Sequence, residues 1–114
     1  MSRRIGFFYE NKAIKFLKSN GHEIIYKNFY TPYGEIDIIT YFMGKIRFIE
    51  VKYLSKIYKI LPVEKINLSK LRKIYFSIAY LQKFSKFNNY QVDAVSLYFK
   101  NKILIAEYLE DLRL

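Results

Sequence analysis

The stretch that most constrains this chain runs from Gly34 to Lys52, where two apolar segments carry charged residues at positions that a buried strand normally fills with aliphatic ones. Both segments are rich in Ile, and the intervening Phe42-Met43-Gly44 is typical of a tight turn. We therefore expect two antiparallel strands over residues 35–41 and 45–54. An ionised side chain in an apolar interior is costly unless another group pairs with it or coordinates it. The charges in these strands therefore indicate a function.

The acidic side chains of these two strands are expected to converge. Residues two apart in a strand point to the same face, so Glu35 and Asp37 share one face, and Glu50 and Lys52 share a face of the next strand. The start of one strand and the end of the other are neighbours in an antiparallel hairpin, so Asp37 and Glu50 can approach each other. Two such carboxylates form a site for Mg²⁺ or Mn²⁺, to which the carbonyl of Val51 could add a ligand.

Two interpretations of this set stay open on the residues alone. In the first, a bound metal ion polarises a phosphodiester and activates a water, while Lys52 orients that water or stabilises charge on the phosphate. The chain has no cysteine and one histidine, which excludes thiolate catalysis and metal sites built from cysteine or several histidines. In the second, Lys52 neutralises Asp37 or Glu50 in an ordinary cross-strand ion pair.

The rest of the chain predicts an α/β fold. A helix is expected over residues 3–19, with a glycine stop at Gly21, and its apolar stripe comprises Ile5, Phe8, Ala13, Phe16 and Leu17. A strand follows over 23–30, and an irregular basic link is expected over 56–62. A second helix should begin at a Ser69 cap and reach Phe84, with the stripe Leu71, Ile74, Ile78 and Leu81. Strands over 90–99 and 103–106, joined by a turn at Asn101-Lys102, complete a mixed sheet with helices on its faces.

Length and composition bound the class of protein. The 114 residues fit one domain, residues 1–114. No uncharged run approaches the ~20 residues that cross a bilayer, and the N-terminus lacks a secretory pattern, so we expect a cytoplasmic protein without a membrane partner. The 12 tyrosines and 10 phenylalanines supply material for an apolar interface, so a homodimer is compatible with the composition.

The net charge of +10 favours a polyanionic partner such as nucleic acid, although a compositional drift toward Lys, Ile, Asn, Tyr and Phe explains it equally well. Lys70, Arg72 and Lys73 crowd the start of the second helix, where the helix dipole disfavours positive charge. A bound phosphate would resolve that conflict. Lys70 and Lys73 are therefore candidates for nucleic-acid binding, and Arg3 and Arg4 could extend the same basic surface.

The order of motifs resembles that of a known nuclease superfamily. Asp37, followed after a hairpin by Glu50-Val51-Lys52, resembles the PD-(D/E)XK signature. The longer pattern is closer to the YraN family of bacterial endonuclease-like proteins, and its matching residues are Gly6, Glu10, Ala13, Leu17, Asn28, residues 34–39 and 48–52, Pro62, Lys70 and Asp93. The resemblance implies a restriction-endonuclease-like α/β/α sandwich with a central mixed five-stranded sheet, similar to that of archaeal Holliday-junction resolvases.

The resemblance also implies a metal-dependent nuclease acting on DNA, including branched or otherwise structured DNA. Asp37, Glu50, the Val51 carbonyl and Glu10 would surround Mg²⁺ or Mn²⁺, and Lys52 would serve the attacking water. On the residues alone, Glu10 would be a solvated glutamate, and Glu35 is a weaker candidate that could tune the site. A non-catalytic nucleic-acid-binding or interaction module on the same fold is the alternative.

The chain departs from the family pattern at three places. Family members commonly carry arginine at three places: near Tyr30, just after Glu-Val-Lys, where this chain has Tyr53-Leu54, and before Asp93, where Gln91 stands. None of these residues can grip a phosphate with the bidentate fork of a guanidinium. Substrate contacts at these three positions are therefore expected to differ from those of the family.

Overall fold

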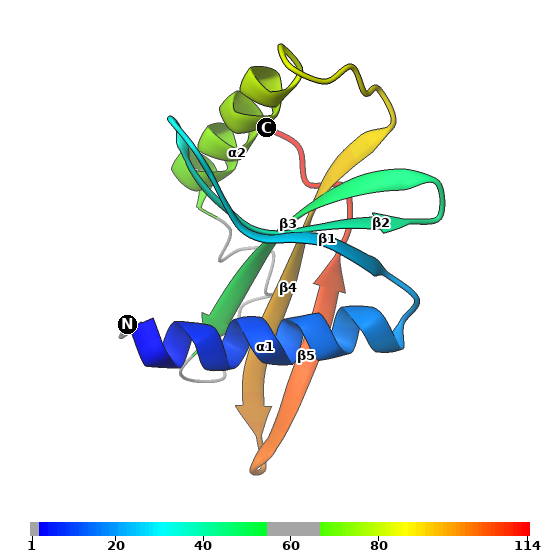
Figure 1. The fold of residues 1–114 in the computed structure, drawn as a ribbon. Coiled ribbons are helices and arrows are strands. Elements are labelled where there is room, and N and C mark those ends of the chain that lie inside the picture. Colours follow the sequence, from blue (N-terminus) through cyan, green and yellow to red (C-terminus); the bar gives the residue numbers. More distant parts are fainter. Residues whose placement is uncertain (1–2, 55–66) are drawn as a thin grey trace.

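The computed structural model of the chain describes residues 3–54 and 67–114, and the side chains from Ile5 onward. Across these residues the elements follow in the order α1 (Arg3–Ser19), β1 (Glu23–Thr31), β2 (Gly34–Phe42), β3 (Lys45–Leu54), α2 (Leu68–Leu81), β4 (Tyr90–Lys100) and β5 (Ile103–Leu109) (Figure 1). The predicted order of helix, three strands, helix and two strands is confirmed. The predicted basic link over 56–62 lies outside the described residues.

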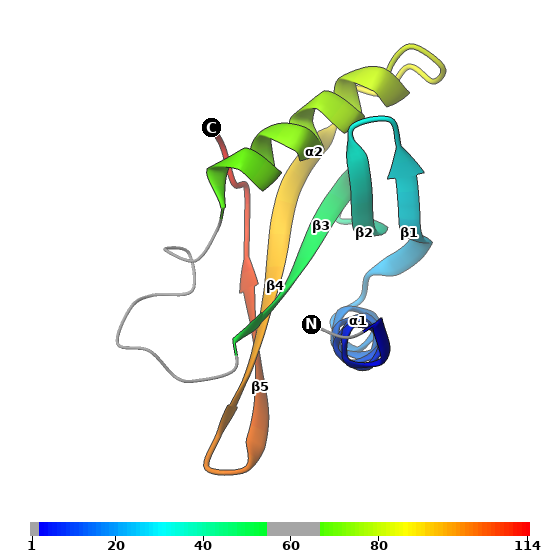
Figure 2. The same cartoon turned by 90° about the vertical axis from the view of Figure 1, so that its left-hand side faces the viewer.

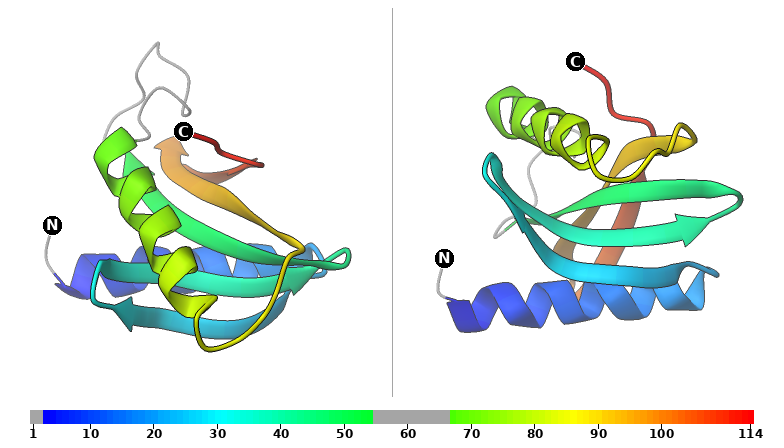
Figure 3. Two further views of the ribbon diagram at one scale, coloured as in Figure 1. Left: turned by 90° about the horizontal axis from the view of Figure 1, so that it is seen from above. Right: turned by 45° about the horizontal axis from the view of Figure 1, so that its top comes forward.

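The five strands form one mixed sheet in the order β1-β2-β3-β4-β5. Neighbouring strands are antiparallel except for β3 and β4, which are parallel. Parallel strands need a crossover connection, and α2 lies in the segment that joins β3 to β4. The helices α1 and α2 cover opposite sides of the sheet (Figures 2 and 3). The predicted α/β/α sandwich with a central mixed five-stranded sheet is therefore confirmed.

Left-handed residues end α1 and close two hairpins where the sequence predicts turns. The β2–β3 turn has φ of 49° at Met43 and 77° at Gly44, and the β4–β5 turn has φ of 51° at Asn101 and 66° at Lys102. Two consecutive left-handed residues match the twist of the flanking strands. Gly21, with φ of 94°, supplies the predicted stop just after α1.

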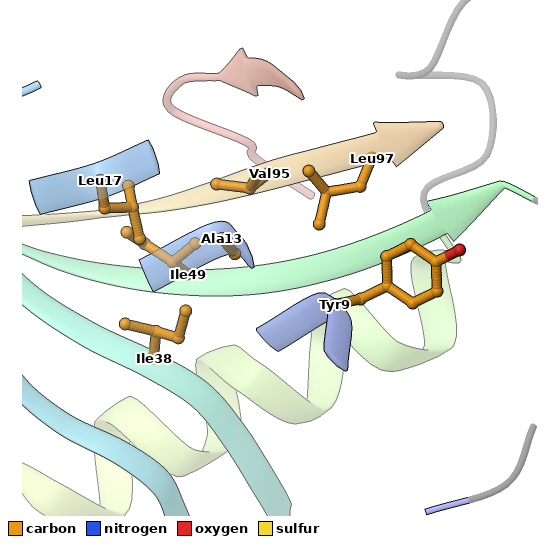
Figure 4. Packing of buried hydrophobic residues seen from close by; sticks show 7 residues of the cluster. All are labelled: Tyr9, Ala13, Leu17, Ile38, Ile49, Val95 and Leu97. Atoms are coloured by element: carbon orange, nitrogen blue, oxygen red, sulfur yellow. The ribbon is translucent and has the colours of Figure 1, made fainter. Parts of the chain in front are cut away.

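The helix α1 packs on the sheet through three residues spaced four apart. Tyr9, Ala13 and Leu17 are buried, and they form a cluster with Ile38, Ile49, Val95 and Leu97 (Figure 4). The predicted stripe is right at Ala13 and Leu17 and wrong at Ile5 and Phe8, which are each 44% exposed. Phe8 lies to the side of the Tyr9–Leu17 line, and Ile5 lies on that line one turn before the contact with the sheet begins.

The helix α2 begins earlier than predicted. Asn67 Oδ1 accepts hydrogen bonds from the backbone N–H groups of Ser69 (2.8 Å) and Lys70 (3.3 Å), so Asn67 is the cap and Ser69 is already helical. The prediction of a Ser69 cap is wrong because Asn67, an equally strong capping residue, precedes it; the helix also ends at Leu81 rather than Phe84. The predicted stripe buries Leu71, Ile74 and Ile78 against Ile36, Ile39, Phe48 and Val92.

A buried ion pair joins the middle of the sheet to the C-terminal segment. Arg47 of β3 and Asp93 of β4 are 4% and 0% exposed, and Arg47 Nη1 lies 3.3 Å from Asp93 Oδ2. Asp93 also accepts hydrogen bonds from Gln91 Nε2 (2.8 Å), the Tyr108 hydroxyl and the backbone N–H of Asp111 (2.9 Å). Four donors on one carboxylate satisfy a charge that would otherwise be very costly to bury.

His22 should make the fold sensitive to acid. Its Nδ1 lies 2.8 Å from Thr40 Oγ1, and its ring stacks on Phe42 with centroids 4.0 Å apart. Burial and the charge of Arg47 lower the pKa of His22, and the acidic Asp93 and Glu110 oppose them only partly. The unfolded chain therefore takes up a proton that the folded chain does not, so stability falls as pH drops below the ordinary histidine pKa.

A comparison with His22→Gln measures this effect, because other groups titrate in the same range in both proteins. When the pH is lowered from 7.5 to 5, the melting temperature of the wild type should fall further than that of His22→Gln. Equal losses in the two proteins would show that His22 does not titrate between the folded and unfolded states.

Neither helix in the described ranges has the length and apolar character needed to span a lipid bilayer.

Candidate metal centre

Three carboxylates from two elements converge at one end of β2. Glu10 of α1 and Glu35 and Asp37 of β2 each offer one oxygen that lies within 4.8 Å of the oxygens of the other two. Glu10 and Glu35 are half-buried, and Asp37 is buried. Within the described ranges, no lysine or arginine forms an ion pair with any of the three. In a chain with 20 basic and 10 acidic residues, such a cluster without a basic partner requires a physical reason.

The end of the β2–β3 hairpin positions Asp37. The pairing of these strands runs from Phe42 opposite Lys45 to Ile38 opposite Ile49. Beyond that pair, the backbone N–H of Val51 donates to Asp37 Oδ2 at 2.9 Å, so a side chain continues the contact between the strands. One Asp37 oxygen is thereby held against β3, while its carboxylate stays within the acidic cluster.

The strand does not alternate strictly at this point. Ile36 and Ile39 pack in the same cluster beneath α2, although residues three apart in a regular strand face opposite sides. The interruption lies at Asp37, next to Asn28 of β1, whose φ is 54°. Regular alternation predicts that Glu35, Asp37 and the residues after them follow one pattern of faces. That prediction is incomplete, because the backbone twists after Asp37.

Asn28 links the acidic side chains. Its Nδ2 donates to Glu10 Oε1 at 3.0 Å and to Glu35 Oε1 at 3.1 Å, so the two hydrogens of one amide hold side chains from α1 and β2. Glu10 therefore pairs with Asn28, and the solvated glutamate of the alternative interpretation is not what the structure contains. In the sequence Asn28 stood out only through the family resemblance. Asparagine within an otherwise strand-like run is a signal, since it disfavours strands and tolerates left-handed φ.

Glu50 lies beside this cluster but faces two lysines. Its side chain is buried, and Oε1 lies 2.6 Å from Lys70 Nζ and 3.6 Å from Lys52 Nζ. Oε2 is buried and has no hydrogen-bonding partner in the part of the chain that the structure describes. The structure thus groups Asp37 with Glu10 and Glu35, whereas Glu50 is drawn toward α2. The ion pair between Lys52 and Glu50, one of the two that the alternative interpretation predicts, is also observed.

The acidic groups resist full ionisation in this arrangement. Burial, reinforced by the charges of Asp37 and Glu35, raises the pKa of Glu10 to about 7. Burial and the charge of Asp37 raise the pKa of Glu50 to about 7, against the opposing effect of Lys70 and Lys52. The same two causes raise the pKa of Glu35. These shifts mean that burial and the neighbouring negative charges both disfavour the ionised carboxylates, and added positive charge would favour them.

The predicted nucleic-acid-binding residues differ in their surroundings. Burial alone would lower the pKa of Lys70, but the Glu50 carboxylate outweighs it and raises that pKa. Lys73 is exposed on α2. The side chains of Arg3 and Arg4 lie outside the described part of the chain, as does Pro62.

Two of the departures from the family pattern make contacts within the fold. Gln91 is 9% exposed and is hydrogen bonded to Asp93, and the ring of Tyr53 stacks on Tyr9 with centroids 3.9 Å apart. Tyr30 is 69% exposed and is the most exposed of these three side chains. The expectation of altered substrate contacts therefore applies mainly to Tyr30.

The donor set fits a hard divalent cation. Glu10, Glu35, Asp37 and Glu50 offer only carboxylate oxygens, which suit Mg²⁺ or Mn²⁺ and do not select soft metals. Oε2 of Glu50 is a buried acceptor to which no group of residues 5–54 or 67–114 donates, and such an atom is costly unless a cation or donor reaches it. Val51, whose carbonyl is predicted as a further ligand, donates its backbone N–H to Asp37.

Comparison with known proteins identifies the family. Residues 9–97 match the model of the uncharacterised protein family UPF0102. A UPF0102 protein of Campylobacter hominis is 41% identical over 105 residues, which cover 91% of each chain. A UPF0102 protein of Campylobacter fetus subsp. fetus is 40% identical over 93 residues, which cover 81% of each chain. A match over most of the chain, with relatives at this identity, means that the protein belongs to the UPF0102 family, the YraN family of the sequence resemblance.

Proposed function

We propose that the protein is a metal-dependent nuclease that hydrolyses phosphodiester bonds in DNA. The observation that carries the proposal is the convergence of Glu10, Glu35 and Asp37, each with an oxygen within 4.8 Å of the others and without a basic partner in the described ranges. Keeping three carboxylates together costs stability, because burial first and the charges of Asp37 and Glu35 second raise the pKa of Glu10. A site that binds Mg²⁺ or Mn²⁺ accounts for that cost.

Glu10, Glu35 and Asp37 would hold the ion, with Glu50 and the Val51 carbonyl as further donors. When bound, such an ion neutralises charge on the phosphate and lowers the pKa of a water molecule. Asn28 fixes the two glutamates, and the Val51 N–H fixes Asp37. The three carboxylates that would hold the ion lie on α1 and β2, and groups of β1 and β3 orient them.

Two lysines would act on the substrate. The Lys52 side chain is 22% exposed near the end of β3, and its Nζ can donate a hydrogen bond to the attacking water or to a phosphate oxygen. Lys70, at the N-terminal end of α2, is 45% exposed even though it contacts Glu50, so it can also approach a phosphate. Lys73 is exposed on the same helix and would add affinity for the DNA backbone.

A binding module without catalysis is the second candidate. The contacts of Lys70 and Lys52 with Glu50 favour it, because they neutralise one acid of the motif without a metal ion. In this case the ion pairs are structural, and the basic residues carry the affinity for nucleic acid. Dependence on a divalent cation separates the two candidates.

The test is a cleavage assay combined with calorimetry. Purified protein is incubated with labelled duplex, single-stranded and four-way-junction DNA in Mg²⁺, in Mn²⁺ or with a chelator. The nuclease proposal expects cleavage of at least one substrate that the chelator abolishes, together with Mn²⁺ binding in a calorimetric titration. Binding of DNA without cleavage and without Mn²⁺ binding would favour the second candidate.

Asn28→Gly should weaken metal binding without unfolding the protein. Glycine adopts the φ of 54° readily, so the variant removes the amide and retains the backbone. Loss of a residue that orients metal ligands typically costs about 10- to 100-fold in metal affinity. We expect a loss of this size for Mn²⁺ by calorimetry.

Asn101→Gly is the matched control, because Asn101 has a similar φ of 51° in the β4–β5 turn and does not contact the acidic cluster. Its Mn²⁺ affinity should equal that of the wild type. Equal Mn²⁺ affinity in Asn28→Gly would show that Asn28 does not position the glutamates for a metal ion.

A further inference from the structure

An exposed row of aromatic side chains lies on α2, on the segment just after it and on the β1–β2 turn. It comprises Tyr33, Phe76, Tyr80 and Phe84, and we refer to these four residues as the aromatic row. Ring centroids are 5.7 Å apart between Tyr33 and Phe76, 6.3 Å between Tyr33 and Tyr80, and 5.1 Å between Tyr80 and Phe84. Tyr33, Phe76 and Phe84 are 46%, 51% and 73% exposed. A continuous exposed aromatic surface of this kind indicates a binding site rather than scattered apolar residues.

Hydrogen bonds hold the row in place. Thr31 Oγ1 lies 2.7 Å from Ser77 Oγ, which ties the β1–β2 turn to α2. The same Thr31 oxygen accepts the backbone N–H of Tyr33 at 3.1 Å, so the turn presents Tyr33 beside Phe76. On α2, Phe76 and Tyr80 are four residues apart and therefore share one side of the helix. Figure 2 shows α2 alongside the turn between β1 and β2.

The charges around the row select a polyanion. From residue 67 to residue 92 the sequence contains five basic residues and no acidic residue. All five are exposed; Lys70 contacts Glu50, and the other four are Arg72, Lys73, Lys83 and Lys86. A second copy of the same face would bring like charges together, which disfavours self-association through this surface. The partner must therefore be anionic and must also offer flat apolar groups to the rings.

We infer that the aromatic row stacks the unpaired bases of a nucleic-acid strand while the neighbouring lysines and Arg72 contact its phosphates. Exposed aromatic rings combined with basic residues are the usual platform for single strands, because every base has a face that can stack. Bases inside a duplex already stack on each other and cannot use such a platform. The substrate class is then DNA with an unpaired stretch. A role of the aromatic row in cleavage rests on the proposed function.

The helix α2 connects the row to the candidate metal centre. Lys70, on its first turn, lies 2.6 Å from Glu50, and Phe76 follows six residues later. At 1.5 Å per residue these positions are about 9 Å apart along the helix axis. A strand held on the row would therefore enter the site from one side of α2.

The test uses fluorescence anisotropy in the presence of a chelator, so that binding is measured without cleavage. The probes are an oligothymidylate, an abasic oligonucleotide of the same length, and a duplex. We expect the double variant Phe76→Ala/Phe84→Ala to bind the oligothymidylate at least tenfold more weakly, with little change for the abasic strand. Lys73→Ala should weaken binding of both strands equally, because its contribution is electrostatic.

Two controls separate this inference from the proposed function. Phe99→Ala removes a ring of similar exposure, 45%, at the far end of β4, and it should bind like the wild type. The chelator, present in every binding measurement, is the second control, because it removes any contribution of a bound metal ion.

Equal losses for the thymidylate and abasic strands, or no loss in the double variant, would overturn the stacking inference. A dimer in sedimentation experiments that dissociates in the double variant would also overturn it and assign the row to self-association. If oligothymidylate binding behaves as expected but no substrate is cut, the nuclease proposal fails while the binding inference stands. If metal-dependent cleavage occurs without the stacking effect, the binding inference alone fails.

Discussion

Asp37→Asn should abolish Mn²⁺ binding and lower the rate of metal-dependent cleavage by more than about a hundredfold. Residues that merely orient metal ligands typically cost 10- to 100-fold when removed, so loss of a charged ligand should cost at least as much. The fold should survive, since an asparagine side-chain oxygen can still accept the hydrogen bond of the Val51 N–H. The negative charge of Asp37 also raises the pKa of Glu10 and Glu50, so its removal relieves repulsion at neutral pH.

Thermal melting separates the loss of metal from the loss of folding. Without metal, Asp37→Asn should melt at the temperature of the wild type or above it. Added Mn²⁺ should raise the melting temperature of the wild type, since a ligand at a hundredfold excess over its Kd contributes about 2.7 kcal/mol. Asp37→Asn should show no such rise. Asp111→Asn, which changes an exposed carboxylate outside the acidic cluster, should behave like the wild type in both assays.

Unchanged Mn²⁺ binding and cleavage in Asp37→Asn would contradict the assignment of Asp37 as a metal ligand. A fall in the metal-free melting temperature would contradict the electrostatic argument and assign Asp37 a structural role. The two outcomes are independent, because one concerns metal affinity and the other concerns the folded chain alone.

Asp93→Ala should destabilise the protein by about 3–5 kcal/mol, because it leaves the buried Arg47 guanidinium without its buried partner. For a domain of this size that loss corresponds to a fall in melting temperature of roughly 10–20 °C. The loss should be large because Asp93 joins β3, β5 and the C-terminal segment through Arg47, Tyr108 and the backbone of Asp111. Differential scanning calorimetry measures the effect directly.

An exposed ion pair of the same type provides the control. Arg113 lies 2.7 Å from Asp111, with side chains that are 77% and 45% exposed, so Arg113→Ala should leave the melting temperature nearly unchanged. The double variant Asp93→Ala/Arg47→Met should recover part of the stability, since it removes the unpaired buried charge. A small effect of Asp93→Ala, similar to that of Arg113→Ala, would show that the buried network does not stabilise the sheet.

Most of the fold was predictable because its elements depend on local patterns. The β3 strand was predicted over residues 45–54 and observed as Lys45–Leu54, and α1 matches its predicted bounds of Arg3–Ser19. Hydrophobic periodicity and turn residues act within a few positions, so they can be read from a single sequence. The errors also have local causes, as when Asn67 rather than Ser69 captures the first N–H groups of α2.

The candidate site was predictable only in part. The sequence was sufficient to select Asp37 and Glu50 as charges out of place in apolar strands, to limit a metal site to carboxylates, and, through the family resemblance, to add Glu10. It did not reveal that Asn28 holds Glu10 to Glu35, or that Lys70 reaches Glu50. Asn28 is 18 residues from Glu10, and Lys70 is 20 residues from Glu50. All of these contacts join different elements and depend on how α1 and α2 pack on the sheet. The sequence by itself determined the strands and the charges within them, because these depend on local patterns. Only the tertiary structure decided the distances between side chains on separate elements, because the two hydrophobic clusters hold the helices against opposite faces of the sheet.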